Sequence, residues 1–203
     1  MIGIIDYGIG NLRSVYRAVE KAGGKVRMIK SSSEFSGLNG VILPGVGNFG
    51  DCCRALKSSG MWEEAGNWAR SGHPFFGVCV GYQMLFESSE EAPGVPGLSV
   101  FLGKVHRFPA GPLKVPQIGW NQVRKVGRSP MLKEINDGDF VYFVHSYYVQ
   151  PEDPQLTSLE TEYGVTFVSA IEQGNLFATQ FHPEKSQRVG LQLWKNFVSL
   201  VAK

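Results

Sequence analysis

The chain has 203 residues, of which 43% are hydrophobic and 19% are charged, a composition that excludes intrinsic disorder and favours one domain, residues 1–203, around one core. Its 20 basic and 18 acidic residues give a formal net charge of +2, too balanced for a protein that binds nucleic-acid backbones. Three cysteines cannot form a paired framework, and neither a signal peptide nor a membrane-spanning run is evident, so we expect a cytoplasmic protein with no membrane partner.

Short apolar runs alternate with helical patterns over the first ninety residues. The expected strands are 2–5, 26–29, 40–43 and 74–79. The expected helices lie between an N-cap at Asn11 and the Gly23-Gly24 pair, at 51–58, at 61–70 and at 82–88. This alternation implies right-handed crossovers and a parallel sheet covered on both faces.

The middle of the chain changes character, because five prolines between 93 and 116 interrupt the runs. Strands are expected at 99–108, 121–126, 140–149, 166–171 and 176–181, and an amphipathic helix at 186–201. The sequence therefore predicts an α/β fold, a three-layer sandwich whose central sheet is mixed but mostly parallel.

The segment Gly77-Val78-Cys79-Val80-Gly81 has the form G-x-C-x-G between an expected strand and an expected helix. It is the sulfur counterpart of the nucleophile elbow, in which small flanking residues leave room for a strained turn. The positive end of the following helix would favour the Cys79 thiolate, and the Val80 N–H would be available to an oxyanion. The alternative is a buried cysteine beside two incidental glycines.

A second segment, Gln-Phe-His-Pro-Glu-Lys-Ser at 180–186, lies at the end of the last expected strand and just before the last expected helix. In an extended chain His182 and Glu184 point to the same side, and Pro183 biases His182 toward that conformation. A cysteine nucleophile needs a base whose far nitrogen is held by a carboxylate, so Cys79, His182 and Glu184 form a candidate triad. The alternative is a surface ion pair at a strand end.

Acyl transfer also needs donors for an oxyanion. The loop Pro44-Gly45-Val46-Gly47 follows a buried strand, and its glycines let main-chain N–H groups approach a substrate, so Val46, Gly47 and Val80 are the candidate oxyanion donors. Ligands of open α/β sheets bind at the carboxyl ends of the strands, where this loop, Cys79 and His182 are all expected. The alternative is an ordinary strand-to-helix turn.

Other motifs carry less chemistry. Gly8-Ile9-Gly10 begins like a dinucleotide fingerprint, but Arg13 stands where the third glycine belongs, which argues against a nucleotide cofactor. His73 and His106 are expected to be structural, whereas His145 either lines the site or packs in the core. The four histidines lie far apart in sequence, so we expect neither a metal nor another cofactor.

The segments at 77–83 and 182–186 resemble the class I glutamine amidotransferases, flavodoxin-like enzymes that release ammonia from glutamine. Asp-Tyr-Gly-Ile-Gly-Asn-Leu at 6–12, and the segments at 44–50, 119–121 and 143–147, are similar to the glutaminase subunits of imidazole glycerol phosphate synthases. This resemblance spans essentially the whole chain. It implies that Cys79 is the nucleophile, His182 the general base and acid, and Glu184 its orienting carboxylate.

The resemblance also implies a glutamine-binding set made of Gln83 and the main chain at Gly47, Ser146 and Tyr147. Three positions depart from the family pattern: Val80 where Leu is usual, Tyr82 where Met is usual, and Gln117-Ile118 where a His-Met pair is usual. The last departure touches a segment that we expect to be a loop near a partner.

The resemblance further implies histidine biosynthesis and a separate (βα)8-barrel cyclase subunit that consumes the ammonia, as a heterodimer. We expect that partner to dock over the sheet edge that carries the site, with Asn11 and Lys185 among the contacts. Lys185 follows Glu184, so in a continuing extended chain it points away from the triad. The alternatives are a free-standing hydrolase of γ-glutamyl compounds, a glutaminase subunit of another synthase, and a catalytically idle binding module.

Overall fold

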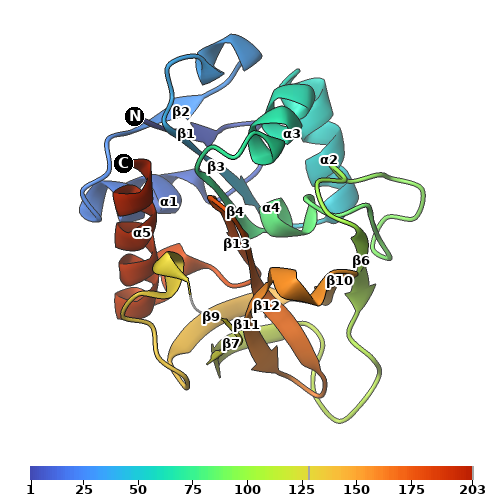
Figure 1. The fold of residues 1–203 in the computed structure, drawn as a ribbon. Coiled ribbons are helices and arrows are strands. Elements are labelled where there is room, and N and C mark those ends of the chain that lie inside the picture. The colour runs from blue at the N-terminus through green and yellow to red at the C-terminus, as the bar shows by residue number, and fades with distance from the viewer. Residues whose placement is uncertain (128, 203) are drawn as a thin grey trace.

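The computed structural model describes residues 1–127 and 129–202, and its centre is a large mixed sheet (Figure 1). Arg128 and Lys203, both inside the expected 1–203 domain, lie outside the described residues. The first part of the sheet is parallel and runs in the order β2 (Val26–Ile29), β1 (Ile2–Ile5), β3 (Gly40–Gly45), β4 (Phe75–Cys79) and β13 (Leu176–Thr179). This is the flavodoxin-like strand order.

The second part of the sheet is mainly antiparallel. It continues from β13 through β12 (Thr166–Gln173), β10 (Tyr147–Pro151) and β6 (Gly103–Arg107), and β5 (Ser88–Ser89) pairs in parallel with β6 at the edge. Off this path, β11 (Thr157–Glu162) pairs with β12 and with β8 (Arg124–Lys125). A separate ribbon consists of β7 (Gln117–Gln122) and β9 (Phe140–His145).

Helices cover both faces of the parallel part (Figure 1). The helices α1 (Leu12–Lys21) and α5 (Gln187–Val201) pack together on one face, and α2 (Phe49–Ser58), α3 (Trp62–Arg70) and the single turn α4 (Val80–Gln83) lie on the other. Short 3₁₀ turns occupy Ser32–Phe35, Pro130–Leu132, Pro154–Leu156 and Pro183–Lys185. The expected three-layer α/β sandwich is therefore confirmed.

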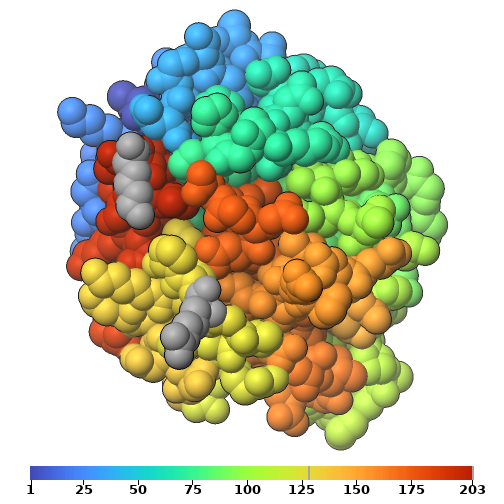
Figure 2. Space-filling model, viewed as in Figure 1, coloured from blue at the N-terminus to red at the C-terminus, as the bar shows by residue number. Residues whose placement is uncertain are grey.

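The apolar runs of the sequence explain this arrangement. Every residue of β1, β3, β4 and β13 is buried, as expected for strands with helices on both faces. The space-filling view shows the early residues, in blue and cyan, above the yellow and orange residues of the second part (Figure 2). Within the described residues, no helix has the length and apolar character to cross a membrane.

The expected helix at 82–88 is wrong. The helix α4 begins at Val80 and ends at Gln83, because the carbonyl of Met84 accepts from Leu98 N and the carbonyl of Leu85 accepts from Val100 N. Residues 82–86 are all buried, so this segment lacks the exposed face that a surface helix has. The following chain pairs as β5.

Several expected strands are wrong at their boundaries. The run 140–149 breaks at Ser146, because the chain leaves the ribbon with β7 there and joins β6 in the main sheet. The run 99–108 is a strand only from Gly103, the run 121–126 belongs to β7 and β8, and β13 ends at Thr179. The sequence analysis missed β11, whose mostly polar residues are ordered by pairing on both sides.

Candidate active site

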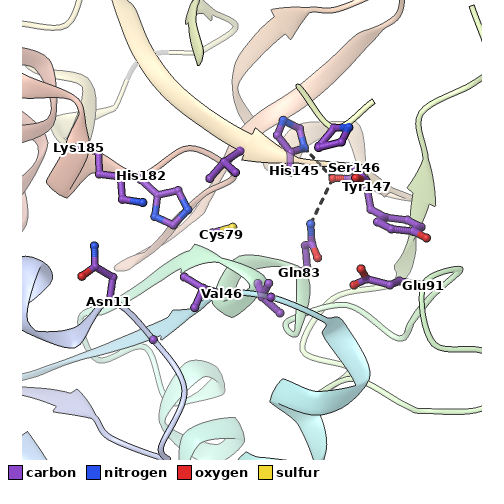
Figure 3. A pocket seen from close by; sticks show the side chains of 15 residues that line it. Asn11, Val46, Cys79, Gln83, Glu91, His145, Ser146, Tyr147, His182 and Lys185 are labelled. Carbon is purple, nitrogen blue, oxygen red and sulfur yellow. Dashed lines mark hydrogen bonds between the residues drawn. The ribbon is translucent and has the colours of Figure 1, made fainter. Parts of the chain in front are cut away.

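A cavity of about 680 Å³ opens at the carboxyl edge of the parallel strands (Figure 3). The candidate residues that line it come from five separate segments: Asn11, Val46, Gly47, Cys79, Val80, Gln83, Ser146, Tyr147, His182 and Lys185. Glu184 does not line the cavity but stands behind His182. The structure therefore brings together every residue that the sequence placed in the site.

Cys79 occupies the turn between β4 and α4. Its backbone has φ +54° and ψ −110°, a conformation that L-residues seldom adopt and that a nucleophile elbow requires. A Cβ at Gly81 would collide with the carbonyl of Leu43 on β3, so glycine is required there by a neighbouring strand. Because α4 is a single turn, the expected helix-dipole effect on Cys79 is small.

His182 is held by Glu184, since its Nδ1 lies 2.8 Å from the carboxylate Oε1. The two side chains are 2% and 1% exposed, so this is a buried pair rather than a surface ion pair. The segment is not extended as expected: Pro183 starts a 3₁₀ turn, and the turn brings the carboxylate back to the ring. Burial disfavours the imidazolium, but the neighbouring Cys79 sulfur and the Glu184 carboxylate outweigh it and raise the pKa of His182 to about 10.

Ser186 fixes this turn against β9. Its hydroxyl donates to the carbonyl of His182 at 2.7 Å and accepts from the N–H of Tyr142 at 3.0 Å. The N–H of His182 also donates to the carbonyl of Tyr142 at 3.0 Å. Sequence reasoning missed this role, because nothing in the order of residues shows that β9 lies beside the turn.

The expected direction of Lys185 is wrong. The 3₁₀ turn carries its side chain to the rim of the cavity, near His182 and across from Asn11 (Figure 3). Its ammonium nitrogen lies 5.7 Å from the centre of the Tyr142 ring. Asn11 occupies the N-cap position of α1, but its side chain makes no capping hydrogen bond with the described residues. Both polar groups therefore face the opening.

Gln83 is buried beside the Ser146-Tyr147 segment. Its Nε2 donates to the carbonyl of Tyr147 at 3.2 Å and to Oε1 of Gln180 at 3.0 Å. Sequence reasoning did not single out Gln180, which is fully buried and lies next to Cys79.

Glu91 is a second residue that the sequence did not single out. It lines the cavity and accepts from the N–H of Phe49 at 2.7 Å. Burial raises the pKa of this carboxyl, which the Phe49 contact partly offsets. Among the described lining residues, Glu91 is the acidic one, so it gives the cavity a place for a cation.

His145 is both a core residue and a lining residue, so the two alternatives hold together. Its Nδ1 lies 2.8 Å from the carbonyl of Tyr147, and its Nε2 lies 2.9 Å from the Gln117 carboxamide. Burial lowers the pKa of His145 to about 4, so the ring is neutral near pH 7. Gln117 and Ile118 lie on a strand rather than the expected loop: Gln117 points inward, and Ile118 is 63% exposed.

The other two histidines that were expected to be structural do not line the cavity. His106 is 2.9 Å from Glu90, and His73 packs against the Trp68 ring. Burial raises the pKa of Cys52 to about 11 and of Cys53 to about 12, so both are thiols near neutral pH. The described residues contain no cluster of side chains arranged to hold a metal ion.

Comparison with known proteins agrees with this geometry. The family model for glutamine amidotransferase class-I matches residues 3–200. The chain is 45% identical to "Imidazole glycerol phosphate synthase subunit HisH" of Syntrophotalea carbinolica, covering 97% of this chain and 98% of that protein. It is 46% identical to the protein of the same name in Deinococcus radiodurans, covering 96% of this chain and 91% of that protein.

Solved structures share the fold at low sequence identity. "Crystal structure of glutamine amidotransferase" aligns with a TM-score of 0.78 and 19% identity, covering 100% of this chain and 99% of that chain. "Structure of PurLQS from Thermotoga maritima" aligns with a TM-score of 0.73 and 17% identity, covering 99% and 96%. From the family match and the near-full-length relatives, this chain belongs to the class I glutamine amidotransferases and, within them, to the HisH subunits of imidazole glycerol phosphate synthase.

Proposed function

We propose that this chain hydrolyses glutamine at Cys79 and passes the ammonia to a cyclase subunit that makes imidazole glycerol phosphate. The observation that carries the proposal is the buried His182, which contacts the Cys79 sulfur on one side and the Glu184 carboxylate on the other, and which lines one cavity together with Cys79. Amide hydrolysis through a thioester needs these three groups in this order: a nucleophile, a base, and a carboxylate that orients the base.

The reaction begins when the Cys79 sulfur attacks the side-chain carbonyl carbon of glutamine. The negative charge that develops on the carbonyl oxygen is met by main-chain N–H groups at Val46, Gly47 and Val80, which border the cavity beside the sulfur. The imidazolium of His182 gives its proton to the departing ammonia. Its raised pKa supports this step, because the ring is protonated near neutral pH.

A water molecule then attacks the thioester while the neutral His182 takes its proton. Glutamate leaves and the sulfur regains its starting form. Throughout the cycle Glu184 accepts from Nδ1, which leaves the other ring nitrogen to serve Cys79 and water.

Two features of the cavity suit glutamine as the substrate. The carboxylate of Glu91 is complementary to the α-ammonium group, and both N–H groups of the Gln83 amide are already used within the protein. The Oε1 of Gln83 is therefore the atom left to accept from the substrate. The main chain at Gly47, Ser146 and Tyr147 lies on the same walls.

The partner docks over the cavity mouth, where the ribbon β7–β9 presents apolar side chains. Ile118, Trp120 and Phe140 are 63%, 46% and 52% exposed on this ribbon. The Trp120 ring packs against Tyr142, and Tyr142 lies under Lys185, so the apolar face runs on into the polar rim formed by Lys185 and Asn11. Ammonia that leaves through such a covered mouth avoids protonation in bulk water. The relatives' names state a synthase subunit, which fits a barrel-shaped cyclase as this partner.

Glutamine hydrolysis by the purified chain is the direct test, alone and with the cyclase subunit from the same cell. Activity should rise when the partner and its substrate are present and should vanish in Cys79→Ala. The Cys79→Ala complex should still form product from ammonia supplied at alkaline pH, because the cyclase chemistry belongs to the partner. Full activity without any partner would favour a free-standing hydrolase, and no activity in either form would contradict the proposal.

A further inference from the structure

Gln180 is a buried polar residue that the mechanism above does not use. It follows β13 directly, its side chain is fully buried, and its main-chain N–H donates to the carbonyl of Ser169 at 2.9 Å. Its carboxamide touches two site residues: Oε1 accepts from Gln83 at 3.0 Å, and Nε2 lies 3.8 Å from the Cys79 sulfur. A buried amide with both ends engaged in this way is held in one orientation.

The direction of these hydrogen bonds is set by a main-chain carbonyl. The oxygen of Tyr147 can only accept, so Gln83 must present its NH₂ group to it. The second N–H of that group points to Gln180, which must therefore turn its oxygen toward Gln83. The NH₂ group of Gln180 is then left facing the sulfur.

The Tyr147 end of this series of hydrogen bonds is also fixed. The Tyr147 carbonyl also lies 2.8 Å from Nδ1 of His145, and the Gln117 carboxamide lies at the other ring nitrogen. Because the Tyr147 oxygen can only accept, Nδ1 of His145 donates to it. The Tyr147 carbonyl, which sets the direction of these hydrogen bonds, therefore contacts both Gln83 and His145.

We propose that Gln180 is a positioning residue, whose N–H group donates to the Cys79 sulfur and holds it as a thiolate in the direction of the substrate. This inference rests on the proposed glutamine hydrolysis at Cys79. It adds to the triad a donor, other than the imidazolium, that acts on the sulfur before substrate arrives. A donor to a charged acceptor in a buried site is stronger than one between neutral groups.

The groups that titrate around the sulfur are few among the described residues. His182 approaches from the turn before α5 with Glu184 behind it, Cys52 from α2, and Tyr7 from the loop after β1. Burial raises the pKa of Cys52 to about 11 and moves that of Tyr7 above its ordinary range, so both are neutral near pH 7. Glu91 and Lys185 also line the cavity. The imidazolium of His182 is the charged group in hydrogen-bond contact with the sulfur, and the effect of Gln180 is measured against it.

The test is the pH profile of alkylation of Cys79 by iodoacetamide, followed by mass spectrometry of the Cys79 peptide. Gln180→Met keeps the length of the side chain but removes the donor. We expect the midpoint of the profile to move to higher pH by about one unit, which corresponds to roughly a tenfold loss of thiolate at a given pH. Glutamine turnover should fall by about tenfold or more, with a smaller change in KM.

Two other variants calibrate this result. Gln180→Glu has nearly the same shape and turns a carboxylate toward the sulfur, so it should move the midpoint further in the same direction. Ser169→Ala is the matched control, because it removes a buried hydroxyl on the neighbouring strand that has no partner among the described residues. It should leave the profile and the turnover within about twofold. A Gln180→Met protein that unfolds at the same urea concentration as the wild type yet keeps the wild-type profile would overturn the inference.

A measurement on the unmodified protein covers the case in which the Gln180 variants do not fold. The side-chain N–H resonances of Gln180 should exchange slowly with solvent and should shift when iodoacetamide alkylates Cys79. Rapid exchange and no shift would also overturn the inference. Neither alkylation nor the resonance requires glutamine hydrolysis, so a protein that shows both effects but no glutaminase activity would refute the proposed function alone.

Discussion

Replacing Glu184 with glutamine tests the triad most sharply, because the side chain keeps its shape and loses its charge. In the structure one carboxylate oxygen accepts from His182 at 2.8 Å, and the other has no partner among the described residues. The amide of a glutamine at this position can therefore face His182 in two orientations. It leaves a buried NH₂ group without a partner, or it turns that group to His182 and forces the ring proton onto the nitrogen that serves Cys79.

The magnitude follows from the burial of the pair. Both side chains are at most 2% exposed, so water does not replace the lost interaction. A hydrogen bond to a charged group contributes about 2 kcal/mol, and the wrong ring tautomer lowers turnover by roughly 10⁴-fold in serine proteases. We therefore expect Glu184→Gln to lower kcat by between about 10²-fold and 10⁴-fold and to lower the free energy of unfolding by about 2 kcal/mol near neutral pH.

The stability loss depends on pH in a defined direction. The pKa of His182 is raised from 6.5 to about 10 in the folded state, so the protonated ring stabilises the fold fully below about pH 6.5, and this contribution is lost as the pH rises through 10. In Glu184→Gln the pKa of His182 is lower. The difference in stability between the two proteins should therefore be fully present at neutral pH and should shrink as the pH rises toward 10.

Urea unfolding at neutral pH and near pH 10, together with glutaminase kinetics, measures both effects. The matched control is Glu87→Gln, whose carboxylate does not line the cavity and accepts from the N–H of Gly103. A stability loss that is equal at the two pH values, or a kcat within about threefold of the wild type, would refute the assignment of Glu184 as the partner of a charged His182.

Three further predictions follow from the geometry. Cys79→Ala should abolish glutamine hydrolysis, whereas Cys53→Ser should keep it within about threefold, because burial keeps Cys53 a thiol that does not react. Iodoacetamide labelling and activity assays measure both effects, and activity in Cys79→Ala would refute the triad. Lys185→Ala should lower partner-stimulated activity severalfold without moving the urea midpoint of the isolated chain, and unchanged stimulation would place the interface elsewhere. Gly81→Ala should lower the free energy of unfolding by about 3 kcal/mol or more, because the new methyl meets the carbonyl of Leu43; a wild-type urea midpoint would contradict that contact.

The parallel part of the fold could be predicted because its signals are local. Buried parallel strands are continuous apolar runs, and glycines or polar residues mark where they stop, so β1, β3 and β4 stand out in the sequence. The antiparallel part could not be predicted as well. The break at Ser146 and the existence of β11 depend on which strands lie beside them, and no local pattern records that.

The site divides in the same way. Cys79, His182 and Glu184 could be predicted, because each lies in a short motif whose residues are neighbours in the sequence. The triad nevertheless forms through a 3₁₀ turn rather than through the expected extended chain. That turn also reversed the expected direction of Lys185. Gln180 could not be singled out, because its contacts join segments about a hundred residues apart in the sequence.

The most direct test of the account is the origin of the nitrogen in the product. The complex with the cyclase subunit is given glutamine whose side-chain amide carries heavy nitrogen, in the presence of an excess of unlabelled ammonium at neutral pH. If the cavity at Cys79 releases ammonia into a covered path, the imidazole glycerol phosphate should carry the heavy nitrogen with little dilution. Product diluted in proportion to the ammonium in solution, or product without the label, would contradict the account.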